Sequence, residues 1–264
     1  MPPSTSVATG ALLPAEDLAL RAAEDLALRA AIAFVWGATG LLVLHPGYRQ
    51  VGASYLDALG LPHALMFATC AAEVLLAAVI LARPFGRGLA LLQASAMLGF
   101  TLILAVHEPM LLVDPFGRLS KNLPMLACIA VVALGREEGW SPRVTRLLRV
   151  GVALPWLTEG LLPKILFPQA VELAIVASSP LSFGPPRAFL AALGALQVLS
   201  FACALLLRGR WLRACLGLQA LALLLLPVLV SLELPALWWH PFGPLTKNVP
   251  ILVGTLLLLR RVPG

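Results

Sequence analysis

The sequence contains few charged residues for its length. Charged side chains make up 12% of its 264 residues, whereas hydrophobic residues make up 60% and the mean hydropathy is +0.92. Soluble globular domains carry about 25% charged residues, so this composition excludes a soluble domain and predicts an integral membrane protein. The net charge of +6 comes from arginines between apolar runs. That pattern favours the lipid surface and gives no indication of nucleic-acid binding.

Cysteine and histidine are also scarce. The four cysteines form no CxxC motif, and no two of the four histidines have a ligand spacing on one predicted helix. A free cysteine in an apolar run is commonly a small buried residue, so a redox-active pair is disfavoured. The histidines lie near the ends of apolar runs, which is more typical of a wet interfacial rim than of haem or metal ligation. The sequence therefore predicts no metal site.

Apolar runs occupy most of the chain. A helix needs about 20 residues to cross a hydrocarbon core of roughly 30 Å, and these runs lack the alternation of barrel strands, so helices are expected. We predict an all-α membrane fold with eight transmembrane helices. Their approximate ranges are 30–44, 63–82, 88–107, 123–135, 148–167, 187–207, 211–232 and 249–259.

The chain also contains an internal repeat. The stretch DPFGRLSKNLP at 114–124 returns as HPFGPLTKNVP at 240–250, each time just before an apolar run. Four spans per copy is an even number, so both copies should enter the membrane from the same side. The sequence therefore predicts two parallel-repeat four-helix bundles that pack as one pseudo-symmetric body. Further residues that recur at similar offsets are Trp36 and Trp156, Gly40 and Gly160, Gln93 and Gln219, and Pro109 and Pro235.

Four segments are expected along the chain. Residues 1–29 form an N-terminal cytoplasmic segment, which looks disordered at 1–13 and then carries the duplicated sequence AEDLALRA. Opposite charges four residues apart in that duplication favour a short solvated or interfacial helix. The two four-helix units are expected at 30–135 and 148–264, joined by a cytoplasmic linker at 136–147.

Basic residues indicate the orientation in the membrane. Positively charged residues concentrate in the cytoplasmic connections of membrane proteins, and thirteen of the 19 basic residues here fall in the N-terminal segment, the even-numbered connections and the C-terminal tail. We therefore expect a multi-pass protein of the cell inner membrane with both termini in the cytoplasm. The thirteen are Arg21, Arg29, Arg83, Arg87, Arg136, Arg143, Arg146, Arg149, Arg208, Arg210, Arg213, Arg260 and Arg261.

The fourth and eighth predicted spans are too short to cross a bilayer alone. At about 1.5 Å per residue they cover only roughly 17 to 20 Å. If their arginine ends lie at the cytoplasmic interface, Lys121, Asn122, Lys247 and Asn248 begin these helices on the order of 10 Å below the outer surface. Non-helical backbone at that depth must lie beside protein or a polar cavity. We therefore expect a buried polar pocket in each half, faced by the helix N-termini.

A lysine at that depth requires a partner, because an unpaired charge there is costly and usually marks function. Glu73 and Glu159 both lie roughly 14 to 15 Å above the cytoplasmic ends of their helices by helical rise, within reach of the lysine side chains. The two acids do not occupy equivalent positions in the two copies of the repeat. Gln197 stands in place of Glu73 in the second copy, and Thr39 stands in place of Glu159 in the first.

Lys164 adds a second cation to the later half alone, and Pro163 beside it should bend the helix. Two interpretations of these polar residues remain open. They can simply hold helices together, for gains of about 0.6 to 2 kcal/mol. Alternatively, they form a cationic recess suited to a small anion, a quinone carbonyl or a polar head group. No nucleophile, base and orienting group occur together, so spacing indicates no catalytic set.

The motifs PFGRLSKNLP and HPFGPLTKNVP, together with the run WLTEGLLPKILFP from Trp156, resemble the DoxX-like family of four-helix membrane proteins over nearly all of residues 30–262. The first half departs from the family pattern, because Leu44 stands where a Pro-Lys element is expected. The resemblance implies a membrane subunit linked to thiosulfate:quinone oxidoreductase or to other redox partners. The positions that fit are Trp156, Glu159, Pro163, Lys164, Lys247, Asn248 and Pro250.

We therefore expect a membrane-embedded binding or redox-accessory component that recognises a quinone or a small anion, with a membrane or redox protein as partner. A small-solute transporter is an alternative, for which parallel repeats offer a precedent, and so is a structural subunit without a ligand. The sequence assigns no cofactor. The apolar residues below the two acids mildly disfavour transport. The expected pocket residues are Trp156, Glu159, Lys164, Gln197, Lys247, Asn248, Glu73, Lys121 and Asn122.

The predicted orientation can be tested with a peptide tag at either terminus. Both tags should resist protease added to intact cells, because both ends are expected in the cytoplasm. Cleavage of one tag alone would contradict an even number of spans, and immunoblotting of each tag measures the outcome.

Overall fold

The computed structural model describes residues 15–179 and 183–263, and within these ranges the regular structure is entirely helical. The first half of the chain contains α1 (Ala15–Leu41), α2 (Pro46–Ala58), α3 (Ala64–Ala82), α4 (Arg87–His107) and α5 (Asn122–Glu138). The second contains α6 (Pro142–Leu161), α7 (Ala170–Ser178), α8 (Pro186–Leu206), α9 (Gly209–Glu233) and α10 (Asn248–Arg261). Four short helical turns complete the fold: η1 (Leu42–Leu44), η2 (Pro109–Val113), η3 (Leu162–Leu166) and η4 (Pro235–Trp239).

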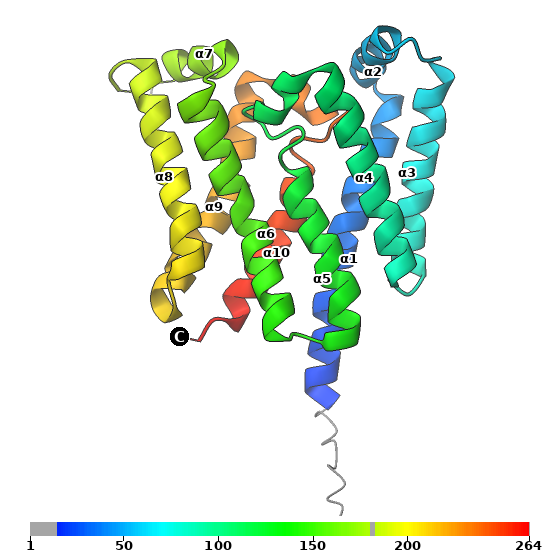
Figure 1. The fold of residues 1–264 in the computed structure, drawn as a ribbon, viewed down its shortest axis with the longest axis vertical. Coiled ribbons are helices and arrows are strands. Elements are labelled where there is room, and N and C mark those ends of the chain that lie inside the picture. The colour runs from blue at the N-terminus through cyan, green and yellow to red at the C-terminus, as the bar shows by residue number, and fades with distance from the viewer. Residues whose placement is uncertain (1–14, 180–182, 264) are drawn as a thin grey trace, which may run out of the picture.

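The two halves run in the same direction. In Figure 1, α1 and α6 rise from the lower end of the molecule, and α5 and α10 descend to it. The described chain therefore begins and ends at the same end. One apolar core joins the halves, because it contains Ile32 and Met125 from the first and Leu148, Leu216 and Ile251 from the second.

Five helical segments are long and apolar enough to cross a membrane: 16–44, α3, α4, α8 and α9. A sixth crossing is formed only if residues 142–166 and α7, which meet at 90°, count as one broken span. The remaining long helices, α5 and α10, have 17 and 14 residues. The chain is thus a multi-pass helical membrane protein, and the number of eight crossings stays a prediction.

Helix boundaries differ from the sequence prediction at several places: α2 and α7 were not predicted, and two of the differences concern the expected segments. The expected interfacial helix is continuous with the first span, because AEDLALRA consists mostly of strong helix formers and contains no Pro or Gly. The predicted linker at 136–147 is largely helical, since α5 continues to Glu138 and α6 begins at Pro142. Ser141 caps α6 by accepting a hydrogen bond from the Val144 amide at 3.2 Å. The expected disorder at residues 1–13 lies outside the described residues.

An arginine from the first helix of each half caps the C-terminal end of a neighbouring helix. Arg29 donates hydrogen bonds to the carbonyls of Ile80, in the last turn of α3, and of Arg83, just after it, at 2.6 and 2.7 Å. Arg149 donates to the carbonyls of Ala204, in the last turn of α8, and of Leu207, just after it, at 2.5 and 2.6 Å. These arginines satisfy carbonyls that a helix end otherwise leaves without partners. The same interaction therefore occurs in both copies of the repeat.

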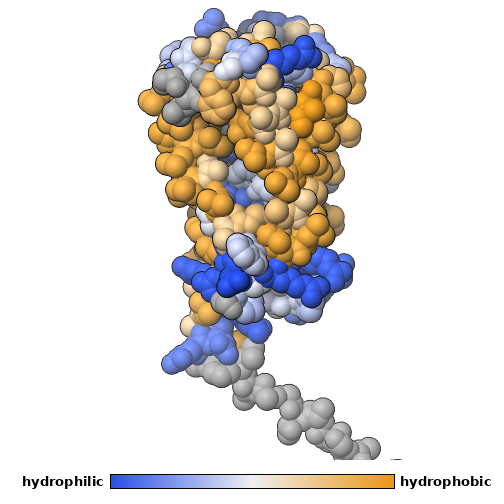
Figure 2. Space-filling view, turned by 90° about the vertical axis from the view of Figure 1, so that its left-hand side faces the viewer, coloured by the Kyte–Doolittle hydropathy of each residue, from blue (hydrophilic) through white to orange (hydrophobic). Residues whose placement is uncertain are grey.

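The surface carries a broad apolar belt above an end rich in basic residues. Figure 2 shows orange side chains around the middle of the molecule and blue ones gathered at its lower end. Many large apolar side chains of α3, α4, α8 and α9 are exposed, as expected where helices contact lipid. White and blue atoms are also visible inside a hollow in this belt, on the side where α7 and α8 lie.

We predict that Arg149→Leu lowers the free energy of unfolding by about 1 to 3 kcal/mol, because two carbonyls of α8 lose a charged donor. Unfolding by detergent titration in mixed micelles measures the change. Arg143→Leu is the matched control, since the Arg143 side chain is 71% exposed and should contribute less than about 0.5 kcal/mol. Equal effects of the two substitutions would contradict the capping role of Arg149.

Candidate functional site

The two copies of the PFG motif form the same turn before α5 and α10. The Asp114 carboxylate accepts hydrogen bonds from the Phe116 and Arg118 amides at 2.9 and 3.3 Å. In the second copy, His240 Nδ1 accepts from the Phe242 amide at 3.4 Å. The glycines of the two turns, Gly117 and Gly243, have φ angles of +73° and +53°, a region that only glycine adopts readily.

His240 can replace the acid because its ring stays neutral. It lies between α9 and α10, outside the candidate spans. Burial lowers the pKa of the ring from 6.5 to about 3, and the positive charges of Arg118 and Lys247 act in the same direction. The unprotonated Nδ1 therefore remains available as an acceptor for the turn.

Each motif lysine donates a hydrogen bond to the backbone of the other motif. Lys121 Nζ donates to the Pro244 carbonyl at 3.0 Å, and Lys247 Nζ donates to the Arg118 carbonyl at 2.9 Å. Arg118 and Pro244 occupy the same position in the two copies of the motif. We call these two reciprocal hydrogen bonds the lysine clasp. Both ammonium groups are buried, with the residues 6% and 8% exposed.

Each lysine of the clasp lies beside residues of the opposite half of the molecule. Lys121, from the first half, lies 3.6 Å from the Glu159 carboxylate on α6 of the second half. Lys247, from the second half, lines a cavity with Glu73 on α3 of the first half. The adjacent asparagines stay in their own halves, Asn122 in the first cavity and Asn248 in the second. A cavity in each half was expected, but the sequence did not indicate this exchange.

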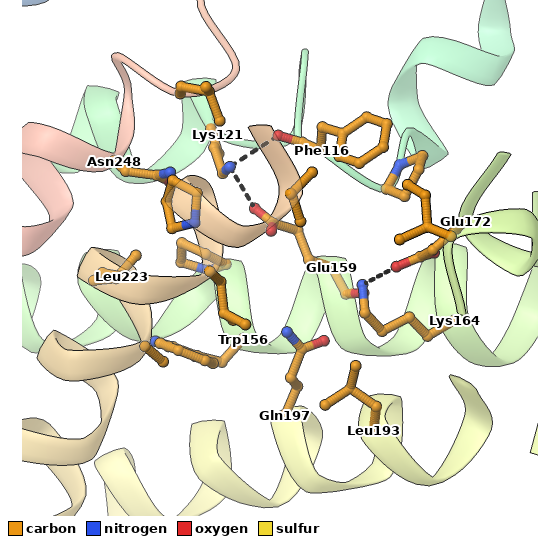
Figure 3. A pocket seen from close by; sticks show the side chains of 18 of the residues that line it. Phe116, Lys121, Trp156, Glu159, Lys164, Glu172, Leu193, Gln197, Leu223 and Asn248 are labelled. Atoms are coloured by element: carbon orange, nitrogen blue, oxygen red, sulfur yellow. Dashed lines mark hydrogen bonds and ion pairs between the residues drawn. The ribbon is translucent and has the colours of Figure 1, made fainter. Parts of the chain in front are cut away.

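The second cavity, of about 190 Å³, lies among α6, α7, α8, α9 and the first PFG turn. Figure 3 shows its polar end, where Lys121 faces Glu159 and Lys164 faces Glu172. Lys164 and Glu172 form an ion pair of 2.7 Å. Lys121 also donates to the Phe116 carbonyl at 2.8 Å. Every lysine in this cavity therefore has a carboxylate partner.

Glu172 was missed by the sequence analysis, although it is the one acid in the apolar stretch that follows Lys164. It reaches the cavity because a π-helical turn at Leu162–Leu166, which contains Pro163, lets α7 fold back at 90°. The predicted bend beside Pro163 is therefore present. With two lysines and two glutamates, the formal charge of the cavity walls is balanced, so they do not form the net cationic recess that was one of the two interpretations of the sequence.

Several buried polar atoms of the second cavity have no hydrogen-bond partner. They include one donor, Trp156 Nε1, and side-chain oxygens of Glu159, Glu172, Gln197 and Asn248. Buried polar groups normally find partners, so this concentration of unpartnered atoms is informative. The rest of the wall is mostly apolar, formed by Leu190, Leu193, Leu223, Leu226 and Val230 among others.

The first cavity, of about 150 Å³, is built from equivalent elements but is chemically different. Trp36 Nε1 donates to Gln93 at 3.1 Å, whereas the equivalent Trp156 has no partner. Asn122 donates to the Thr101 hydroxyl at 2.8 Å. Among the described residues Lys247 forms no ion pair with a carboxylate. All nine pocket residues expected from the sequence thus line one cavity or the other, divided between the two.

No cluster of three metal-ligating side chains occurs within residues 15–179 and 183–263. The four cysteines are free. Cys70 lies 3.1 Å from the Tyr48 hydroxyl, and Cys128 lies 3.7 Å from the Pro250 carbonyl. Cys70 and Cys128 are buried, and Cys203 and Cys215 are partly exposed.

The fold and the two cavities, each with a polar end and mostly apolar walls, define a multi-pass helical membrane protein with two related halves. The chain belongs to the DoxX-like family, whose sequence pattern matches it at residues 33–130 and again at 153–256, consistent with a tandem arrangement of two units. The resemblance inferred from the motifs is therefore confirmed. No curated protein and no solved structure was found to match the chain.

We predict that Gly117→Ala destabilises the protein by about 1 to 3 kcal/mol. The substitution forces a left-handed conformation on alanine, and the new methyl group would lie 2.7 Å from Glu159 Oε1. Gly99→Ala is the control, because nothing lies within 4 Å of its Cβ position in α4 and alanine favours a helix. Detergent unfolding that shows no difference between the variants would contradict the tight packing of the turn on Glu159.

Proposed function

We propose that the second cavity binds a quinone, and that the protein is a membrane-embedded binding or redox-accessory component. The observation that carries the proposal is the group of unpartnered polar atoms at one end of an otherwise apolar cavity. A quinone has matching chemistry, since its ring oxygens need polar partners and its substituents need apolar ones. Ligand sites commonly combine apolar walls with a few convergent polar groups.

The polar end offers partners for both redox forms of such a ring. A quinone carbonyl accepts hydrogen bonds, and the Trp156 N–H is an unused donor in the cavity wall. A hydroquinone hydroxyl donates, and the unpartnered side-chain oxygen of Gln197 can accept. The ion pairs of Lys121 with Glu159 and of Lys164 with Glu172 hold the two carboxylates in the same wall.

Charge balance favours a neutral ligand over a small anion. An anion would gain attraction from Lys121 and Lys164 but would face repulsion from Glu159 and Glu172 at similar range. It would also lose its hydration on entering a cavity with mostly apolar walls. A neutral ring avoids both costs.

The position of the cavity supports entry from the lipid. Polar atoms are visible in a hollow of the apolar belt in Figure 2, and a lipid-soluble molecule reaches such an opening from the bilayer. Toward the arginine-rich end, buried apolar side chains of both halves fill the centre, among them Met125, Cys128, Leu148 and Ile251. A transporter needs a polar route through this layer, so the packing supports the binding component instead.

We also propose the membrane arrangement expected from the sequence: eight spans in the inner membrane, with the arginine-rich end and both termini in the cytoplasm. The concentration of thirteen of the 19 basic residues in the N-terminal segment, the even-numbered connections and the C-terminal tail supports that orientation. The two cavities would then open on the outer half of the bilayer. A redox protein as partner is part of the same proposal.

The quinone proposal is tested by purifying the full-length protein with its lipids and measuring bound quinone by mass spectrometry. We expect Trp156→Phe to retain roughly tenfold less quinone, because the ring is kept but the donor is lost. Trp36→Phe is the matched control, since its N–H is already bonded to Gln93, and its quinone content should equal that of the wild type. Absence of quinone from the wild type would instead support a structural subunit, and equal loss in both variants would indicate non-specific destabilisation.

A further inference from the structure

We propose that the first cavity is a second, independent binding site, which takes a small single-ring aromatic alcohol of the phenol class. The proposal concerns the walls of the first half and does not depend on quinone binding in the second. Three features of the cavity support it: its size, its aromatic walls, and an acid and an amine that are not paired with each other.

The size of the first cavity suits one aromatic ring. Its volume is about 150 Å³, and a protein cavity of about that volume can hold a benzene molecule. Four aromatic side chains contribute to its wall, together with Met97 and Leu104. Aromatic side chains favour edge-to-face or offset contacts with a bound ring. The four are Trp36, Tyr48, Phe100 and Phe242.

The polar end of the first cavity suits a single hydroxyl group. Lys247 is 8% exposed, and its Nζ donates one hydrogen bond, to Arg118, among the described residues. Glu73 Oε2 is buried without a partner in the same wall. An ammonium has three donors and a carboxylate only accepts. A hydroxyl between them would accept from Lys247 and donate to Glu73, so one group would satisfy both side chains.

The comparison between halves explains why this site differs from the second. In the second cavity the motif lysine reaches its acid directly, because Glu159 stands on α6 at the position of Thr39. In the first cavity the acid is Glu73 on α3, and no ion pair with Lys247 forms within the described residues. Asn122, 6% exposed, adds an unpartnered side-chain oxygen to the same wall. The first cavity therefore differs from the second in that its motif lysine and its acid are not paired with each other.

The test measures binding of phenol to the full-length protein in lipid nanodiscs by saturation-transfer NMR, with toluene as a probe of similar size that lacks the hydroxyl. We expect phenol to bind at least tenfold more tightly than toluene. Glu73→Leu, which leaves the lysine clasp intact, should weaken phenol binding about tenfold and leave toluene unchanged. Lys164→Met is the control, because it alters a buried lysine of the other cavity and should not affect phenol.

Thr69→Leu provides a variant that keeps both charges. Thr69 lines the first cavity and donates its hydroxyl to the nearby Met66 carbonyl, with no contact to either lysine of the clasp among the described hydrogen bonds, so leucine there should fill space without disturbing the lysine clasp. We expect phenol binding to be lost while the unfolding transition is unchanged. Equal binding of phenol and toluene, or phenol binding that survives in Thr69→Leu, would overturn the proposal. Neither outcome would alter quinone retention in the second cavity, so the two proposals can fail separately.

Discussion

The arrangement of both cavities depends on the lysine clasp. Two buried ammonium groups lie where short helices begin inside the apolar body of the protein, and each is held by a backbone carbonyl of the other motif. Charge at such depth is costly unless hydrogen-bonded. The clasp meets that requirement reciprocally, and in doing so it fixes the two PFG turns against each other and against the walls of the opposite halves.

This reciprocity makes the two halves one structural unit. The turn around Gly117 packs on Glu159 of the second half, and the turn around Gly243 packs near Thr39 of the first. A single apolar core also joins the halves. The two copies of the repeat therefore form one body and not two separate bundles. Each cavity is lined by the motif lysine of the other copy and by the motif asparagine of its own.

The two cavities differ in the positions of their carboxylates and in Lys164, which only the second contains. Glu159 and Glu172 neutralise the lysines of the second cavity, whereas Glu73 lies on a different helix in the first and leaves Lys247 without a paired acid. Because the lysine clasp needs only carbonyl acceptors, the acids were free to change position. The same scaffold can therefore present one cavity whose lysines are paired with acids and another whose lysine is not.

The membrane helices, the repeat and the burial of the two motif lysines could be predicted, because each can be recognised in the sequence itself. Composition and run length indicate membrane helices, and the offset between copies of the motif indicates the repeat. The short apolar runs after Lys121-Asn122 and Lys247-Asn248 place those residues at depth, since helical rise converts sequence distance into distance along the membrane normal. Their burial and the bend beside Pro163 followed from such reasoning.

The partners of each lysine were decided only by the tertiary structure. The depth of a residue along the membrane normal does not indicate which neighbouring helix its side chain faces. The sequence therefore could not predict that Lys121 and Lys247 each reach into the opposite half. Glu172 was missed for the same reason, because only the fold-back of α7 brings it to Lys164. The sequence by itself determined a membrane protein with buried lysines in two related halves. The packing of turns from one half on helices of the other determined which charges meet, because such contacts depend on helix rotation and loop path rather than on spacing along the chain.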